Sequence, residues 1–188
     1  MNRRWLLPLV AALLICPPAV AGAAPVRAFD KDHVHVVVSS EPKRVEWDVM
    51  IPGSVDVVWN AFTTEAGLTS WLAPMATGDA RPGGDWLVSF PGGPAPAGGT
   101  IVELQPQAFI AIAAMAPGTY PTVRKERTYA LFTFASAGKN ATRVHLTQTG
   151  WRDGTEWDAA MEYLAVGNAQ LLEALYQRFV SGPTHWGT

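Results

Sequence analysis

The sequence is short of cysteine, of basic residues and of long apolar runs. Its one cysteine, Cys16, lies in an N-terminal segment typical of a cleaved export signal. We therefore expect the exported protein to lack disulfides and to have no cysteine nucleophile. No apolar run after this segment is long enough to cross a bilayer, so no membrane span is expected in the mature protein.

Acidic side chains outnumber basic ones. Of the 14 basic side chains, Arg3 and Arg4 belong to the expected signal, which leaves 12 against 16 acidic ones. The resulting mildly negative surface argues against nucleic acid and anionic lipid headgroups as partners.

Residues 1–23 have the three parts of a secretory signal peptide. Arg3 and Arg4 form a basic start, residues 5–15 form an apolar run, and residues 19–23 offer small side chains for cleavage. We expect this signal to be removed and the mature protein to be periplasmic or secreted. About 165 residues then remain, enough for one domain and too few for two ordinary ones.

Within the mature chain we expect a leader or an extra edge strand over residues 24–43, one domain over residues 44–180 and a tail over residues 181–188. Residues 44–51 alternate apolar and polar side chains, which is the period of a strand with one solvated face. Two short helices should follow directly. Ser54 is placed to cap the first, and Pro74 ends the second.

Beyond Pro74 the chain has the pattern of an antiparallel meander. Short β patterns at residues 85–90, 100–106, 108–116, 127–135 and 142–150 are separated by glycine pairs and turn residues. None of the glycine pairs has the lysine and following helix of a phosphate-binding loop.

One long helix should end the domain, with Thr155 as its N-cap. An apolar stripe at intervals of three and four residues continues for about 23 residues, roughly 35 Å. Gly167 and Asn168 interrupt this stripe near its middle, where a large apolar side chain is expected. The interruption predicts an unfilled space between the helix and the sheet.

These elements predict an α+β fold in which a curved antiparallel sheet of about six to seven strands wraps around the C-terminal helix, with two short helices after the first strand. Three segments carry a family resemblance: VDVVWNAFTTEAGLTSWLAP at residues 55–74, RPGGDW at 81–86 and TGWRDGTEWDAAMEYL at 149–164. Through them the chain resembles the START-like, or SRPBCC, superfamily of helix-grip folds. Within it, the chain is similar to the group related to the C-terminal domain of the heat-shock-protein ATPase activators.

The resemblance covers about residues 45–179, and it implies a ligand cavity between the sheet and the last helix. Many relatives have aromatic side chains where this chain has Leu72 and the pair Gly167 and Asn168, which hints at a roomier cavity. The partner that names the group is a cytosolic chaperone. Because we expect export, we do not expect that chaperone as a partner.

Polar candidates for chemistry are few. His33 and His35 are two residues apart on a strand-like run and could share a metal with Asp30 or Asp32, or they could simply lie on an exposed strand face. His145 shares a strand face with Arg143 and could be a general base if that face points inward. We assign no catalytic residue, no metal site and no cofactor.

Our main hypothesis is a protein that encloses a small, mostly apolar molecule, with Trp71 at the lid and with Tyr129 and Asn168 as polar anchors. The side chains expected around the ligand are Trp59, Trp71, Tyr129, Leu131, Trp157, Met161, Leu164 and Asn168. Two alternatives remain open. One is a cyclase- or hydrolase-like enzyme that uses His145 or Tyr129 as acid or base, and the other is a chaperone-like interaction protein of the cell envelope with no cavity.

Overall fold

The computed structural model describes residues 26–187, so the expected signal peptide over residues 1–23 lies outside the described residues. Nine antiparallel strands form one sheet in the order β1-β2-β3-β9-β8-β7-β6-β5-β4. The strands are β1 (Val26–Lys31), β2 (Val34–Ser40), β3 (Lys43–Ile51), β4 (Met75–Gly78), β5 (Asp85–Ser89), β6 (Ala97–Gln105), β7 (Phe109–Met115), β8 (Thr128–Ser136) and β9 (Thr142–Thr149). The antiparallel sheet is confirmed.

The expected strand count of six to seven was too low, because β1 and β4 were missed. The segment expected as a leader or extra edge strand forms a hairpin of two strands, β1 and β2, paired from Val26 with Ser39 to Lys31 with Val34. Asp32 at its turn has a φ of 53°, a conformation that aspartate tolerates in tight turns. β1 is largely exposed and β4 has only four residues, so neither shows a clear alternation of apolar and polar side chains.

Four helices complete the described residues: α1 (Val55–Thr63), α2 (Glu65–Thr69), α3 (Pro121–Glu126) and α4 (Thr155–Ser181). The two short helices after β3 are confirmed. Ser54 lies at the N-cap of α1, but its side chain makes no capping hydrogen bond. None of the helices in the described range is both long and apolar enough to cross a membrane.

Two details of the helices differ from expectation. α4 has 27 residues and begins after Gly154, which takes the N-cap place expected for Thr155 and has a φ of 130°. α3 was not predicted, although Pro121 at its first position is a common start signal.

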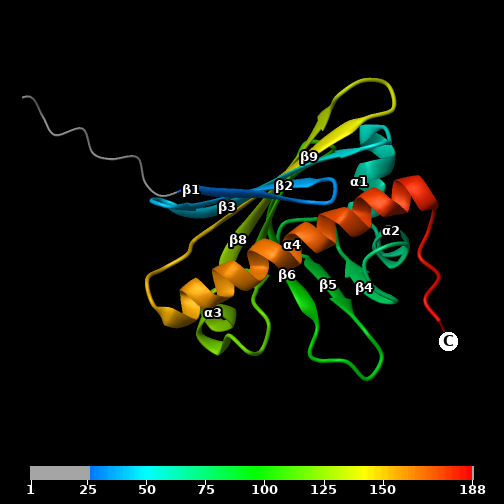
Figure 1. The fold of residues 1–188 in the computed structure, drawn as a ribbon. Helices are drawn as coiled ribbons and strands as arrows, with labels where there is room; N and C mark the ends of the chain where they lie inside the picture. Colours follow the sequence, from blue (N-terminus) through cyan, green and yellow to red (C-terminus); the bar gives the residue numbers. More distant parts are fainter. Residues whose placement is uncertain (1–25, 188) are drawn as a thin grey trace, which may run out of the picture.

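α4 crosses one face of the sheet (Figure 1) and packs against the β1–β3 half of it. Three of its fully buried positions are small, Ala160, Ala165 and Ala169, and Leu172 and Leu175 are buried as well. The indole Nε1 of Trp47 on β3 donates a hydrogen bond of 2.9 Å to the carbonyl of Ala165. Small side chains and this bond hold the helix close to one half of the sheet.

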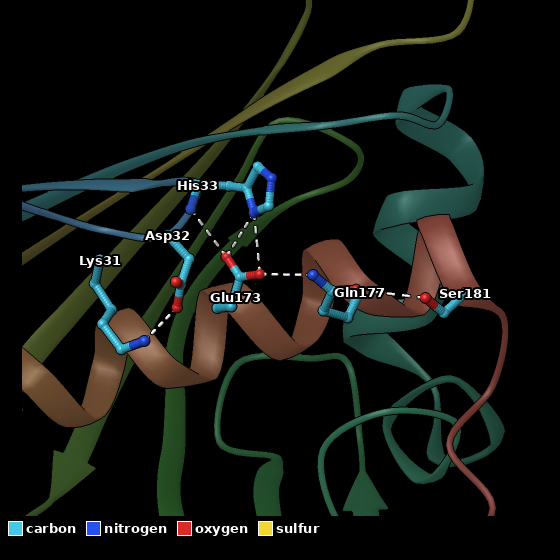
Figure 2. Close-up of polar contacts among 6 residues, drawn as sticks. All are labelled: Lys31, Asp32, His33, Glu173, Gln177 and Ser181. Atoms are coloured by element: carbon cyan, nitrogen blue, oxygen red, sulfur yellow. Dashed lines mark hydrogen bonds and ion pairs between the residues drawn. The ribbon is translucent and has the colours of Figure 1, made fainter.

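The turn of the β1–β2 hairpin is fastened to α4 through Glu173 (Figure 2). The carboxylate of Glu173 accepts hydrogen bonds from the backbone N–H of His33 at 3.1 Å and from Gln177 at 2.8 Å, and it lies 3.0 Å from His33 Nδ1. Burial alone would raise the pKa of Glu173, but the hydrogen bonds from Gln177 and His33 outweigh it and lower that pKa. The His33 ring also stacks on Tyr176, with 3.8 Å between centroids.

Candidate functional site

A cavity of about 400 Å³ lies between α4 and the half of the sheet formed by β5 to β9. Because α4 packs closely on β1–β3, it lies further from this other half of the sheet. Most of the lining is apolar, and its larger side chains include Trp86, Val88, Ile112, Phe132, Leu164 and Leu171. The volume falls within the range of about 300 to 1,000 Å³ typical of small-molecule sites.

Small residues on both walls keep this space open. Gly167 and Asn168 of α4 face Gly98, Ala114 and Ala130 of the sheet across it. A Cβ atom built on Gly167 would meet only Tyr163 Cε1, at 3.9 Å, so the position is not crowded. The space predicted at Gly167 and Asn168 is therefore present.

A pair of side-chain amides joins the two walls of the cavity. Gln148 on β9 is 2% exposed, and its Nε2 donates to Thr128 Oγ1 at 2.8 Å. Its Oε1 accepts a hydrogen bond of 2.8 Å from Asn168 Nδ2. Within residues 26–187, Asn168 Oδ1 has no hydrogen-bond donor, so the pair offers the cavity an acceptor.

Arg124 of α3 is a positively charged side chain in the cavity wall. Its Nη1 donates to the carbonyl of Ala116 at 2.7 Å and its Nη2 to the carbonyl of Pro96 at 3.2 Å. α3 itself is tied to the start of α4, because the carboxylate of Glu156 accepts the backbone N–H of Thr122 at 2.6 Å. Hydrogen bonds from the side chain and backbone of Thr122 lower the pKa of this carboxyl.

Of the eight side chains expected around a ligand, Leu164 and Asn168 line the cavity. Trp71 and Trp59 lie in the core beside it. Trp71 is 2% exposed, and its Nε1 donates to the carbonyl of Ala61, while Leu72, the next residue, does reach the cavity. Trp59 packs edge-on against Phe134, with 5.2 Å between ring centroids.

The other four expected side chains lie elsewhere. Tyr129 is 47% exposed and shares with Leu131 the face of β8 opposite to buried Ala130 and Phe132, which line the cavity. Trp157 and Met161 are buried in the first turns of α4 and are not among the cavity residues. The guanidinium of Arg152 lies over the Trp157 ring, at 5.4 Å from its centroid.

His145 lies on the sheet face that points away from α4, in contact with Asp48 and Thr147. Its Nδ1 is 3.1 Å from Asp48 Oδ2, and Asp48 Oδ1 accepts a hydrogen bond of 2.6 Å from Arg143. Burial alone would raise the pKa of Asp48, but the hydrogen bonds from Arg143 and His145 lower it. Neither His145 nor Tyr129 reaches the cavity, so neither can act there as acid or base.

His33 and His35 do not converge on one point. His33 contacts Glu173 of α4, whereas His35 Nδ1 lies 2.6 Å from Asp30 Oδ1. Over residues 26–187, no three side chains among His, Cys, Asp and Glu come together as metal ligands would.

Arg124 and Gln148 are among the cavity residues that sequence reasoning missed. The signal for Arg124 was Pro121, which favours a helix start. A helix recognised there, between the strand patterns, would have brought Arg124 next to the sheet. Gln148 had a weaker signal, as the only amide side chain within the β9 pattern, and its inward direction depends on the strand's register.

An antiparallel sheet that holds one long C-terminal helix, with two short helices after its first long strand, defines the helix-grip class of the SRPBCC superfamily. The family model described as "Activator of Hsp90 ATPase homolog 1-like protein" matches residues 52–179, and the chain belongs to this family. The matched region begins after β3, so the β1–β2 hairpin lies before it. No curated protein matches the chain in sequence.

Solved structures with the same fold include the Aha1 dimer from Colwellia psychrerythraea, at 22% identity and a TM-score of 0.59, covering 74% of this chain and 97% of that one. Protein MLL2253 from Mesorhizobium loti matches at 17% identity and a TM-score of 0.62, covering 76% and 100%. CalU16 from Micromonospora echinospora matches at 17% identity and a TM-score of 0.56, covering 86% and 85%. At these identities the likeness concerns the fold.

Proposed function

We propose that this protein binds a small, mostly apolar molecule in the cavity between the sheet and α4. The observation that carries the proposal is the cavity itself, which has about 400 Å³ of space and a largely apolar lining. Protein interiors are usually packed without voids of this size. An interior kept open by Gly98, Ala114, Ala130 and Gly167 favours a binding protein over an interaction protein with a collapsed core.

The arrangement of the lining supports binding without turnover. The polar side chains at the cavity are an amide pair, one guanidinium and the phenol of Tyr163. The amides and the guanidinium orient a ligand but are poor proton-transfer groups near neutral pH. His145 and Tyr129, which we considered as acid or base, do not line the cavity. We therefore propose carriage or sensing as the role and assign no reaction.

The test is the binding of a neutral apolar dye, N-phenylnaphthylamine, to the purified protein and to a variant with a filled cavity. Ala114→Trp places an indole in the cavity wall, and Ala135→Trp makes the same change at an exposed position of β8 as the control. We expect the wild type and Ala135→Trp to bind the dye and Ala114→Trp to lose binding while still folding. Equal dye binding by all three proteins would refute the cavity as the site.

Native mass spectrometry of the protein purified from its own cells complements the dye. A retained small mass that solvent extraction removes, and that Ala114→Trp does not carry, would identify the natural ligand. If the wild type and Ala114→Trp carry the same mass, the molecule binds outside the cavity.

We also propose export, on the basis of the N-terminal sequence. An exported protein would be separated from the cytosolic chaperone of its family, so we propose a role that does not include activating it. Cell fractionation and N-terminal sequencing test this. Cleavage near residue 23 with the protein in the envelope fraction is expected, and an intact N-terminus in the cytosol would contradict export.

A further inference from the structure

We propose that the ligand is an apolar molecule with one anionic end, such as a carboxylate, and that Arg124 binds this end. The inference rests on the proposed function and adds the chemical class of the ligand. It comes from the charge in the cavity wall. In the described part of the chain, Arg124 is the only charged residue that lines the cavity, and no carboxylate lies with it there.

Arg124 has no acidic partner elsewhere in residues 26–187 either. Its side chain bonds only to the carbonyls of Ala116 and Pro96, which are neutral acceptors. Two acidic groups in or next to α3 are engaged with other groups: Glu126 pairs with Arg152, and Glu156 accepts the N–H groups at the start of α3. A guanidinium that lacks a counter-ion beside an apolar cavity attracts a ligand that brings one.

The two carbonyl bonds also fix the position of the guanidinium. Each uses one N–H on a different terminal nitrogen, so three of the five guanidinium donors remain free. Because Pro96 precedes β6 and Ala116 follows β7, the guanidinium sits where these two strand ends meet the cavity. An acidic group that entered there would receive charge-assisted hydrogen bonds from a donor that is already positioned.

The amide pair adds a second requirement on the ligand. Asn168 Oδ1 is an acceptor without a donor in the described chain, so it favours a hydroxyl or N–H group on the body of the ligand. Apart from Tyr163, the side chains of the wall that remains are apolar and suit an alkyl or aromatic body.

Three probes with the same alkyl chain test the anionic end: decanoate, decanol and decylamine. Each is titrated against N-phenylnaphthylamine at about pH 7, where the acid is ionised and the amine is protonated. For the wild type we expect decanoate to bind at least about tenfold tighter than decanol, and decylamine to bind weakest. Decanoate binding no tighter than decanol would overturn the proposal.

Variants of Arg124 show whether this residue causes the preference. In Arg124→Gln the ratio of the decanol to the decanoate dissociation constant should fall to about one. Arg124→Lys keeps the charge without the paired donors and should retain part of the preference. A preference that survives intact in Arg124→Gln would overturn the assignment, and the wild-type comparison remains decisive if that variant fails to fold.

The dye separates this inference from the proposed function. If the dye and decanol bind in the cavity but decanoate binds no tighter than decanol, the proposed binding function is supported and the proposal of an anionic ligand is refuted. If neither the dye nor any of the three probes binds, the proposed function falls and the inference falls with it.

Discussion

Asn168 on α4 donates its Nδ2–H to Oε1 of Gln148 on β9 at 2.8 Å, and this bond joins helix and sheet at the edge of the cavity. Gln148 is 2% exposed, so water cannot readily replace a lost partner. The bond therefore has a structural role in addition to any contact with a ligand.

Asn168→Leu should lower the free energy of unfolding by about 1 to 3 kcal/mol, because it leaves the buried Oε1 of Gln148 without a donor. Urea denaturation monitored by circular dichroism measures the change. A variant as stable as the wild type would show that Gln148 Oε1 finds another donor.

Replacing both amides should cost less than the sum of the two single replacements. The double variant Asn168→Leu, Gln148→Leu loses the bond from Gln148 to Thr128 Oγ1, but it leaves no unpaired amide, so the two effects should not add. A double-mutant cycle with the single variants gives the coupling. A coupling near zero would mean that the two side chains do not support each other.

Gly167→Ala should raise the free energy of unfolding by about 0.5 to 1 kcal/mol, since alanine favours a helix interior and the new Cβ meets only Tyr163 Cε1 at 3.9 Å. Thermal unfolding measures the gain, and dye binding should survive because a methyl group fills little of the cavity. Gly53→Ala is a contrasting control, because its Cβ would meet the Phe179 ring at 2.8 Å and should destabilise. A loss of stability in Gly167→Ala would contradict the finding that there is room for a Cβ atom at this position.

Glu173→Ala should loosen the β1–β2 hairpin, because three hydrogen-bonding groups of α4 and the hairpin turn lose their common acceptor. We expect a loss of about 1 to 2 kcal/mol and faster amide hydrogen exchange at Val34 and Val36. The control is Glu162→Ala, whose ion pair with Arg27 is more than half exposed on both sides and should matter little. Equal exchange rates in the two variants would show that Glu173 does not fasten the hairpin.

The stability contributed by Asp48 should depend on pH in acid. Burial alone would raise the pKa of Asp48, but hydrogen bonds from Arg143 and His145 hold it below the ordinary 3.8. A carboxyl whose pKa is lower in the folded than in the unfolded state stabilises the fold at pH values above the unfolded-state pKa. This contribution is lost as the pH falls through the folded-state pKa.

Asp48→Asn should therefore be less stable than the wild type near neutral pH, and the difference should shrink as pH falls below 3.8. Urea denaturation across this range measures it. A difference that grows toward acid would contradict the lowered pKa.

Much of the fold followed from periodicity. The stripe of α4, the apolar spacing of α1 and the alternation of β3 each cover enough residues to be recognised. β1, β4 and α3 are short or exposed, and they form because the neighbouring sheet and helix give them partners.

The site was harder to predict than the fold. Gly167 and Asn168 marked the space because a gap in an apolar stripe is visible in sequence. Which face of a strand points into the cavity is not visible in sequence, since a shift of one residue in the pairing register exchanges the two faces. Tyr129 looked suited to a cavity, yet the smaller Ala130 beside it faces inward.

Methyl nuclear magnetic resonance during titration with N-phenylnaphthylamine tests the central claim most directly. Ile112 and Leu164 line opposite walls of the cavity, whereas Ile51 on β3 is fully buried away from it. We predict that the methyl signals of Ile112 and Leu164 shift and saturate together while that of Ile51 stays in place. Saturated dye binding with no change at Ile112 and Leu164 would contradict a ligand site between the sheet and α4.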